Sequence, residues 1–357
     1  MDRTTRYVIG DERLICRREL LGAGTLAVGA CALPSGTTLA ASRPAAVTPV
    51  EVVPEPQQVA AREGLFDVGG ARLWYWDTGG DGQAVVFLHP GTGNGTSWVY
   101  QQPVFAKAGY RVIGYSRRGS FKSETDANAP AMPGPMTSQD IEDLNKLATH
   151  LQLGRIHLVG IAAGGFVAAQ YLVNFPETLR SVVLGCSLLN IQEPDYQALT
   201  SKAQAPNFQG MPSEYKELSG AYRTLNPEGT ERWIEIEKKN PPNAMTPGAG
   251  GPGGRAGGPA GAAGAPGGGA TALSQSGAGA RKPVNYATLR EASAKVPTLL
   301  MTGDADLYFN PGLLHYLGQR VPAAKRLVLE YSGHAPFWEQ PTEFNRMILD
   351  FIKGHRR

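Results

Sequence analysis

A histidine and an aspartate near the C-terminus are the residues of this sequence with the clearest potential for acid–base chemistry. His334 and Asp306 each follow a short apolar segment, and Asp304 is the second candidate for the acid. A carboxylate bonded to one ring nitrogen of a histidine orients the ring and makes the other nitrogen a general base. We therefore expect His334 and Asp306 to form a proton-accepting dyad if their segments are strands that end side by side.

A glycine-rich segment in the middle of the chain has the form of a sharp turn from a strand into a helix. It has the sequence Gly160-Ile161-Ala162-Ala163-Gly164 and follows an apolar run. In the G-x-S-x-G turn the central serine is a nucleophile, and the flanking glycines are needed because the turn leaves no room for side chains. Here both glycines are present, but Ala162 stands at the centre. Alanine has no lone pair, so an acyl-enzyme mechanism is not expected.

A second loop could stabilise negative charge on a substrate oxygen. The segment His89-Pro90-Gly91-Thr92 follows the apolar residues 84–88. Pro90 has no N–H, so Gly91 or Thr92 is the expected backbone donor, and Ala163 is expected to supply the other donor of an oxyanion hole.

Two side chains could replace the missing hydroxyl, but structural roles are favoured for both. Ser116 follows a predicted strand and suits a turn, whereas Cys186 lies within a predicted strand and suits a buried core. The six histidines lack the spacing of a metal site, and no strand leads into a dinucleotide-binding G-x-G-x-x-G. We therefore predict no metal and no cofactor.

Short apolar strands alternate with helical stretches on both sides of a long interruption. This alternation predicts an α/β fold with a mostly parallel sheet and helices on both faces. The expected strands are 71–76, 84–88, 111–115, 156–160, 181–188, 298–302 and 326–330, and the expected helices are 98–107, 137–151, 164–175, 311–319 and 342–353. Thr137 and Asp140 form a predicted capping box.

The pattern breaks between residues 190 and 295, where an inserted helical cap is expected. Its predicted helices cover 195–202, 213–222 and 230–239. Within the cap, residues 247–279 are almost entirely Gly, Ala and Pro, so we expect a disordered loop there. Aromatic cap residues would favour an aromatic or terpenoid substrate if they lined the pocket, although packing of the cap is the favoured role; they are Tyr196, Tyr215, Tyr222 and Trp233.

The turn, the acid and the histidine occur in the chain order that the α/β-hydrolase superfamily uses. With Tyr115-Ser116-Arg117-Arg118-Gly119 and Trp338-Glu339-Gln340-Pro341, the chain from about residue 65 onward, except the cap, resembles cap-bearing, esterase- and epoxide-hydrolase-like members of that superfamily. The resemblance implies an eight-stranded sheet, with residues 61–189 and 296–357 as the core and 190–295 as the cap. It also implies that His334 is the base, that Asp306 is the acidic residue that orients it, and that Ala162 occupies the nucleophile position.

Three functions fit this altered site. The favoured one is an enzyme whose His334–Asp306 dyad activates water, or the substrate itself, to attack a small carbonyl compound such as an activated ester, a lactone or a β-dicarbonyl carbon–carbon bond. The second is a cofactor-free lyase or oxygenase of the same fold. The third is an inert binding protein, or an engineered serine-to-alanine variant of a serine hydrolase. Ile161 and Ala163 also differ from the His and Met of many relatives, which favours a natural variant.

The first 41 residues resemble an export signal. Arg17-Arg18 precede a weakly apolar run, as in twin-arginine signals, and Thr38-Leu39-Ala40 is an acceptable cleavage site. Alternatively, Val28-Gly29-Ala30-Cys31 resembles a lipoprotein box, which would place a lipid anchor on Cys31. The proline-rich residues 42–60 are an expected linker. We expect a periplasmic or extracellular protein.

The net charge bears on the kind of partner, and the number of cysteines bears on disulfide formation. The formal net charge of the 357 residues is +3 with no basic run, so a small-molecule substrate is expected and nucleic acid is not. After removal of the signal only Cys186 remains, so the folded domain has no pair of cysteines to form a disulfide.

Overall fold

The computed structural model describes residues 50, 52–126, 138–241 and 281–355. The predicted export signal, the first part of the linker, the capping residue Thr137 and the glycine-rich loop 247–279 lie outside the described residues. Within the described ranges, no helix combines the length and the apolar character needed to span a bilayer.

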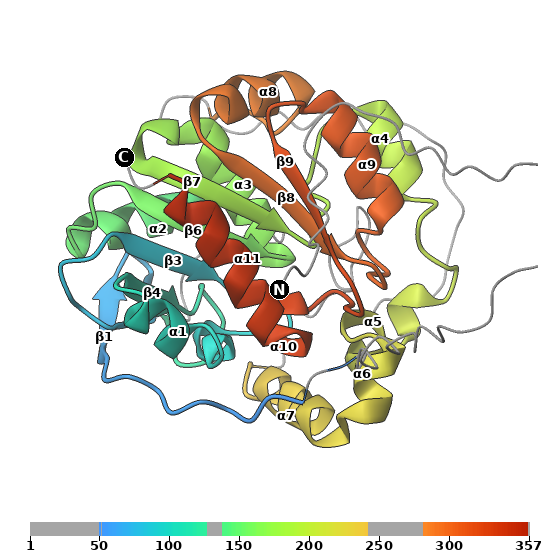
Figure 1. Ribbon diagram of the computed structural model, residues 1–357. Coiled ribbons are helices and arrows are strands. Elements are labelled where there is room, and N and C mark those ends of the chain that lie inside the picture. The colour runs from blue at the N-terminus through green and yellow to red at the C-terminus, as the bar shows by residue number, and fades with distance from the viewer. Residues whose placement is uncertain (1–49, 51, 127–137, 242–280, 356–357) are drawn as a thin grey trace, which may run out of the picture.

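A twisted sheet forms the centre of the molecule (Figure 1). Its strand order is β1-β2-β4-β3-β6-β7-β8-β9, and the short β5 pairs with β2 as a ninth strand. All neighbours from β4 to β9 are parallel, whereas β1, β2 and β5 make antiparallel pairs. The predicted mostly parallel sheet is therefore confirmed. The strands are β1 (Arg62–Asp67), β2 (Ala71–Asp77), β3 (Ala84–Leu88), β4 (Arg111–Tyr115), β5 (Glu124–Thr125), β6 (Ile156–Ile161), β7 (Leu179–Gly185), β8 (Thr298–Gly303) and β9 (Lys325–Leu329).

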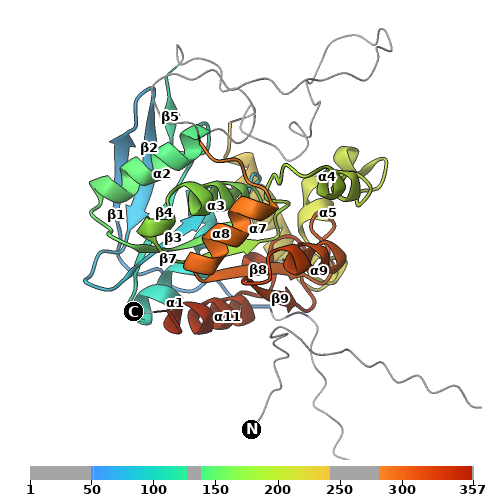
Figure 2. The same ribbon diagram turned by 90° about the horizontal axis from the view of Figure 1, so that it is seen from above.

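Helices cover both faces of the sheet, because every central strand is apolar on both sides. In β3, Val86 and Leu88 belong to one core cluster, and Val85 and Phe87 to the other. Helices α2, α3, α8 and α9 contribute to the first cluster, whereas α1 and α11 contribute to the second. Figure 2 shows α3 and α8 on one side of the sheet and α1 with α11 on the other. These helices are α1 (Gln102–Lys107), α2 (Ser138–His150), α3 (Ala163–Asn174), α8 (Tyr286–Lys295), α9 (Pro311–Arg320) and α11 (Pro341–Lys353).

The chain after β7 forms short helices, as expected for the insertion. The four described before residue 242 are α4 (Pro194–Thr200), α5 (Ser213–Glu217), α6 (Gly220–Leu225) and α7 (Pro227–Lys238). The remaining short helical turns are η1 (Gly95–Trp98), η2 (Pro176–Thr178), η3 (Phe208–Gly210) and α10 (Pro336–Glu339). Helix α8, which lies within the range predicted as cap, packs against α3. The boundaries of the cap remain a prediction.

Two predicted helices are interrupted in the structure. In the region 98–107, η1 ends at Trp98 and α1 begins only at Gln102. Asn94 caps η1, and Pro103 in the first turn of α1 favours a new helix start. The region 213–222 is interrupted at Leu218, and the Ser219 hydroxyl accepts a hydrogen bond from the Tyr222 N–H, which starts α6. Capping competes with helix continuation at such residues.

The aromatic residues of the insertion mostly pack inward. Tyr196, Tyr222 and Trp233 are buried, whereas Tyr215 is half exposed. The Trp233 ring lies 5.9 Å from Phe337 and 5.7 Å from Trp338 between centroids. Packing of the insertion onto the core therefore accounts for Trp233.

Candidate active site

The predicted site segments meet at the carboxyl edge of the sheet. Because β3, β6, β7, β8 and β9 are parallel, the loops after them leave the sheet at the same edge. Leu88 pairs with Gly160, and Ile161 pairs with Gly185. The loop from His89, the turn at Ala162 and the residue Cys186 are therefore neighbours.

Ala162 occupies a strained turn between β6 and α3. Its backbone has φ 53° and ψ −115°, in a region that a side chain disfavours. A Cβ on Gly160 would lie 2.4 Å from the Gly164 carbonyl oxygen, and a Cβ on Gly164 would lie 2.1 Å from that of Leu88. The N–H of Ala162 donates to the Gly185 carbonyl over 2.9 Å. The two glycines are thus required by the close approach of the backbone, as the sequence predicts.

His334 and Asp306 are in direct contact. The Nδ1 atom of His334 lies 2.9 Å from Oδ1 and 3.0 Å from Oδ2 of Asp306. The carboxylate also accepts hydrogen bonds from the N–H groups of Tyr308 (2.8 Å) and Phe309 (3.0 Å). Since an ionised carboxylate can only accept, Nδ1 carries the proton and Nε2 is the basic nitrogen. Asp304 instead accepts a hydrogen bond from the Ser332 N–H over 3.0 Å.

The electrostatics of the dyad favour an ionised aspartate and a basic histidine. Burial alone would raise the pKa of Asp306, but His334 and the two backbone N–H groups lower it below its ordinary value. Burial alone would lower the pKa of His334, but the negative charges of Asp306, Glu217 and Glu339 raise it. His334 is therefore a better proton acceptor than an isolated imidazole.

Two buried glutamates hold the histidine loop against the insertion. The Glu339 carboxylate accepts hydrogen bonds from the Ser219 N–H (2.8 Å) and the Gly333 N–H (2.9 Å). The backbone carbonyl of Glu217 accepts hydrogen bonds from the N–H groups of His334 (2.8 Å) and Ala335 (3.1 Å). Burial raises the pKa of Glu339 to about 7. Sequence reasoning assigned no role to either glutamate: Glu339 entered only as part of a motif, and Glu217 carries no local signal.

The loop that holds the predicted oxyanion donors Gly91 and Thr92 is fixed by hydrogen bonds at each of its ends. His89 Nε2 accepts a hydrogen bond from the Arg117 N–H over 3.1 Å. The side-chain amide of Asn240 donates to the carbonyls of Thr92 (3.2 Å) and Gly93 (3.0 Å). Neither anchor was predicted, since both join segments far apart in sequence.

The second predicted donor lies at the start of a helix. Ala163 is the first residue of α3, and the first N–H groups of a helix have no intrahelical partner. Gly91, Thr92 and Ala163 thus lie on the two backbone segments that adjoin Ala162. Their role as oxyanion donors remains a prediction.

Ser116 has a structural role that accounts for its burial. It is fully buried, and its hydroxyl accepts a hydrogen bond from the Gly95 N–H over 3.0 Å. This contact ties the loop after β4 to the segment that follows the oxyanion loop.

Cys186 lies beside the dyad, a proximity that residue spacing did not predict. The ligand atoms of Cys186, Asp306 and His334 all lie within 4.8 Å of one another. Burial and the charge of Asp306 raise the pKa of the Cys186 thiol well above its ordinary value. A protonated thiol is a poor nucleophile, so Cys186 is a neutral neighbour of the dyad and does not replace the missing serine hydroxyl.

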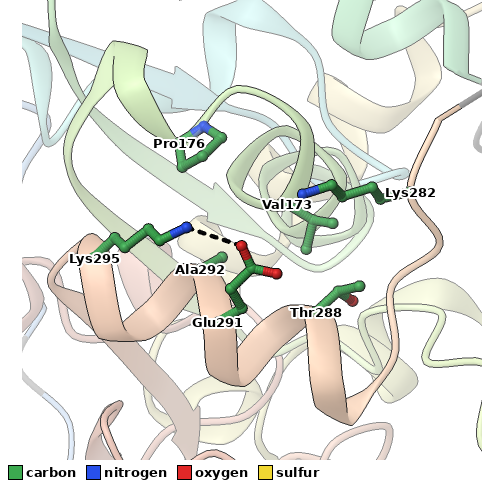
Figure 3. Close-up of a pocket in the computed structure, with 7 residues that line it drawn as sticks. All are labelled: Val173, Pro176, Lys282, Thr288, Glu291, Ala292 and Lys295. Carbon is green, nitrogen blue, oxygen red and sulfur yellow. Dashed lines mark hydrogen bonds and ion pairs between the residues drawn. The ribbon is translucent and has the colours of Figure 1, made fainter. Parts of the chain in front are cut away.

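A small pocket near the C-terminal end of α3, away from the turn at Ala162, does not compete as a substrate site. It lies between α3 and α8 and has a volume of about 40 Å³ (Figure 3). Lys295 Nζ pairs there with Glu291 Oε1 over 2.8 Å. A volume that holds one or two water molecules is too small for a typical organic ligand.

Comparison with known proteins identifies the family of this chain. Residues 83–341 match the family model described as alpha/beta hydrolase fold. The chain is 26% identical to a 2-hydroxy-6-oxononadienedioate/2-hydroxy-6-oxononatrienedioate hydrolase of Burkholderia vietnamiensis, over 79% of the chain and 91% of that relative. It is also 26% identical to a proline iminopeptidase of Clostridium botulinum, over 76% and 90%.

Solved structures show the same fold at lower identity. A thermophilic esterase from Thermogutta terrifontis matches 84% of the chain and 100% of its own length, with a TM-score of 0.60 and 19% identity. An enol-lactonase from Burkholderia xenovorans matches 81% and 100%, with a TM-score of 0.58 and 18% identity.

Proposed function

This chain belongs to the alpha/beta hydrolase fold family, and we propose that it hydrolyses small carbonyl compounds by a mechanism that needs no serine nucleophile. The observation that carries the proposal is the contact of His334 Nδ1 with both oxygens of Asp306, which leaves Nε2 as the basic nitrogen at the sheet edge where Ala162 lies. Activated esters, lactones and carbon–carbon bonds flanked by carbonyls are the proposed substrates. The names of its relatives, which include a hydrolase of oxo-dienedioates and an enol-lactonase, support this class.

In the proposed reaction, water occupies the place of the missing serine hydroxyl. His334 Nε2 takes a proton from the water as its oxygen attacks the carbonyl carbon, and Asp306 stabilises the imidazolium. The N–H groups of Ala163 and of Gly91 or Thr92 bind the oxyanion of the tetrahedral adduct. The imidazolium then returns the proton to the leaving group, which restores the neutral histidine. An oxyanion hole and binding alone retain about 10³–10⁴-fold catalysis over water in serine proteases, so reactive substrates are within reach.

His334→Ala should lower kcat/KM for activated aryl esters and lactones by about 10²-fold or more, because it removes the general base. The measurement compares initial rates of the mature chain and the variant on a panel of these substrates. His315→Ala is the matched control, since His315 is exposed on α9 and contacts Gln319. Equal rates for His334→Ala and the parent would contradict the proposal.

A non-hydrolytic use of the same dyad is the second candidate. A putative non-heme bromoperoxidase of Mycobacterium tuberculosis is 27% identical over 78% of the chain, so relatives are not all named as hydrolases. In a lyase or oxygenase, His334 would abstract a substrate proton instead of a water proton. An inert binding protein, or an engineered variant of a serine hydrolase, would show neither reaction.

We also propose that the protein is exported and is periplasmic or extracellular. Support comes from the sequence of residues 1–41 alone, with a lipid on Cys31 as the alternative to a soluble mature form. The intact mass of the mature protein distinguishes cleavage before Ala41 from a lipidated N-terminal Cys31, and an uncleaved chain would refute both.

A further inference from the structure

A single asparagine side chain joins the insertion to the loop that carries two of the predicted oxyanion donors. Asn240 follows α7, and its Nδ2 atom donates to the carbonyl oxygens of Thr92 (3.2 Å) and Gly93 (3.0 Å). Its Oδ1 atom accepts a hydrogen bond from the Phe121 N–H over 3.0 Å. Since carbonyl oxygens only accept and an N–H only donates, all three partners require the same orientation of the amide. Asn240 therefore joins the end of α7 to the loops after β3 and β4.

The end of α7 makes a second contact with the same loop. The side-chain amide of Asn94 donates to the Ile236 carbonyl over 3.1 Å, and this hydrogen bond is buried. The Asn94 Oδ1 atom accepts a hydrogen bond from the Thr96 N–H, which caps η1. The loop is thus attached to the α7 end at three consecutive residues, Thr92, Gly93 and Asn94.

The attached residues end a tight turn that has the predicted donors at its centre. The Gly93 N–H donates to the Pro90 carbonyl over 3.2 Å and so closes a four-residue turn. This hydrogen bond uses the carbonyl of the first residue and the N–H of the fourth. The N–H groups of the two central residues, Gly91 and Thr92, take no part in it.

Asn240 fixes the orientation of the peptide group that ends this turn. The peptides here are trans, and a trans peptide is planar with its C=O and N–H on opposite sides. Because the Thr92 carbonyl points to Asn240, the Gly93 N–H points the other way, toward Pro90. The Pro90 carbonyl also lies 2.7 Å from His89 Nδ1. The start of the turn is therefore held by the core, and its end by the insertion.

The geometry of this turn matters because an oxyanion hole depends on donors that are already in place. A misplacement of about 1 Å can cost about 10²-fold in rate. Thr92 is only 2% exposed, so a carbonyl that lost its donor there would be a buried acceptor without a partner. We therefore expect the turn to rearrange when the amide of Asn240 is removed.

We propose that Asn240 is a positioning residue that acts through the backbone of Thr92 and Gly93. By holding these carbonyls, it keeps the Gly91 and Thr92 N–H groups of the turn in place to bind the oxyanion. The insertion, which supplies neither the dyad nor the predicted donors, takes part in the reaction in this way. No bond or proton changes at Asn240 itself. The catalytic use of the turn rests on the proposed function, but the hold on the turn does not.

The first test compares kcat and KM of the mature chain, Asn240→Ala and Asn240→Asp on the activated aryl esters and lactones. Aspartate keeps the size and the acceptor for Phe121, but an ionised carboxylate has no hydrogen to donate to the two carbonyls. In both variants kcat should fall by about 10-fold or more and KM should stay within about 2-fold, because the oxyanion forms only in the transition state. A purely structural link between insertion and core would not separate kcat from KM.

Hydrogen–deuterium exchange followed by mass spectrometry tests the hold on the turn without a substrate. A peptide that covers residues 89–97 should exchange faster in both variants, because the Gly93 N–H loses its protection when the turn opens. A peptide from α11 should exchange as it does in the parent.

Asn174→Ala is the matched control for both measurements. The Asn174 Nδ2 atom donates to the Lys282 carbonyl over 3.2 Å, and its Oδ1 atom accepts from the Lys282 N–H over 2.9 Å. This amide also joins distant segments, but it lies at the end of α3 opposite to Ala162. Asn174→Ala should retain the parental kcat and the parental exchange at residues 89–97.

A parental kcat or parental exchange in Asn240→Asp would overturn the proposal, and so would a higher KM with an unchanged kcat. Should Asn240→Ala fail to fold, the nearly isosteric Asn240→Asp alone decides. If the parent has no activity, faster exchange at residues 89–97 in Asn240→Asp would support the hold on the turn and count against the proposed function. Unchanged exchange in that case would overturn the hold on the turn as well.

Discussion

Ala162→Ser is expected to convert the chain into an enzyme that forms a covalent acyl intermediate. The turn is already in the strained conformation, with φ 53°, and the Gly185 carbonyl holds the Ala162 N–H. The dyad of His334 and Asp306 is formed, so a serine at this position would meet a ready general base. Removing the serine of subtilisin costs about 10⁶ in kcat, so we expect its introduction here to raise kcat for activated aryl esters by at least ~10²-fold.

Pre-steady-state kinetics and mass spectrometry measure this result. Ala162→Ser should release a burst of p-nitrophenol from p-nitrophenyl acetate and gain one adduct mass with a fluorophosphonate, whereas the parent should gain none. Ala162→Ser combined with His334→Ala should lose the burst, which separates serine attack from nonspecific acylation. A folded Ala162→Ser protein without an adduct would show that the turn does not present a nucleophile to the dyad. If the parent is inactive on all substrates and Ala162→Ser is active, the serine-free mechanism is wrong.

Gly303→Ala is expected to destabilise the fold and separate the two loops that carry the dyad. Gly303 ends β8, three residues before Asp306, and an added Cβ would lie 2.1 Å from the Ser332 carbonyl oxygen and 2.3 Å from that of Gly333. Both atoms belong to the backbone just before His334, so no side-chain rotation can relieve the overlap. We expect a loss of about 3 kcal/mol in the free energy of unfolding.

Urea unfolding measures the stability, and the downfield Nδ1–H proton signal of His334 reports the contact with Asp306. In Gly303→Ala this signal should weaken or disappear even under conditions in which the protein is folded. The control is Gly210→Ala, where no heavy atom lies within 4 Å of the added Cβ, and its stability should change by less than about 0.5 kcal/mol. If Gly303→Ala were as stable as the parent, the backbone of Ser332 and Gly333 would have to move away from the added Cβ without cost. That outcome would contradict the expected destabilisation.

The sequence alone determined the α/β order of elements and the local form of the turn. Strands 84–88 and 111–115 were predicted with the bounds that the structure shows, because runs of apolar residues between turn residues specify buried strands locally. The need for Gly160 and Gly164 also followed from the turn itself. Such features depend on neighbours in the chain, which a sequence displays directly.

Only the tertiary structure decided which side chains meet. Asp304 and Asp306 are both aspartates that follow β8, but the backbone N–H groups of Tyr308 and Phe309 hold the carboxylate of Asp306, which contacts His334. The proximity of Cys186 and Glu217 to the dyad likewise arises from loops joined by long-range backbone contacts. These contacts depend on strand register and on how the insertion packs onto the core, and neither has a signature in local residue spacing.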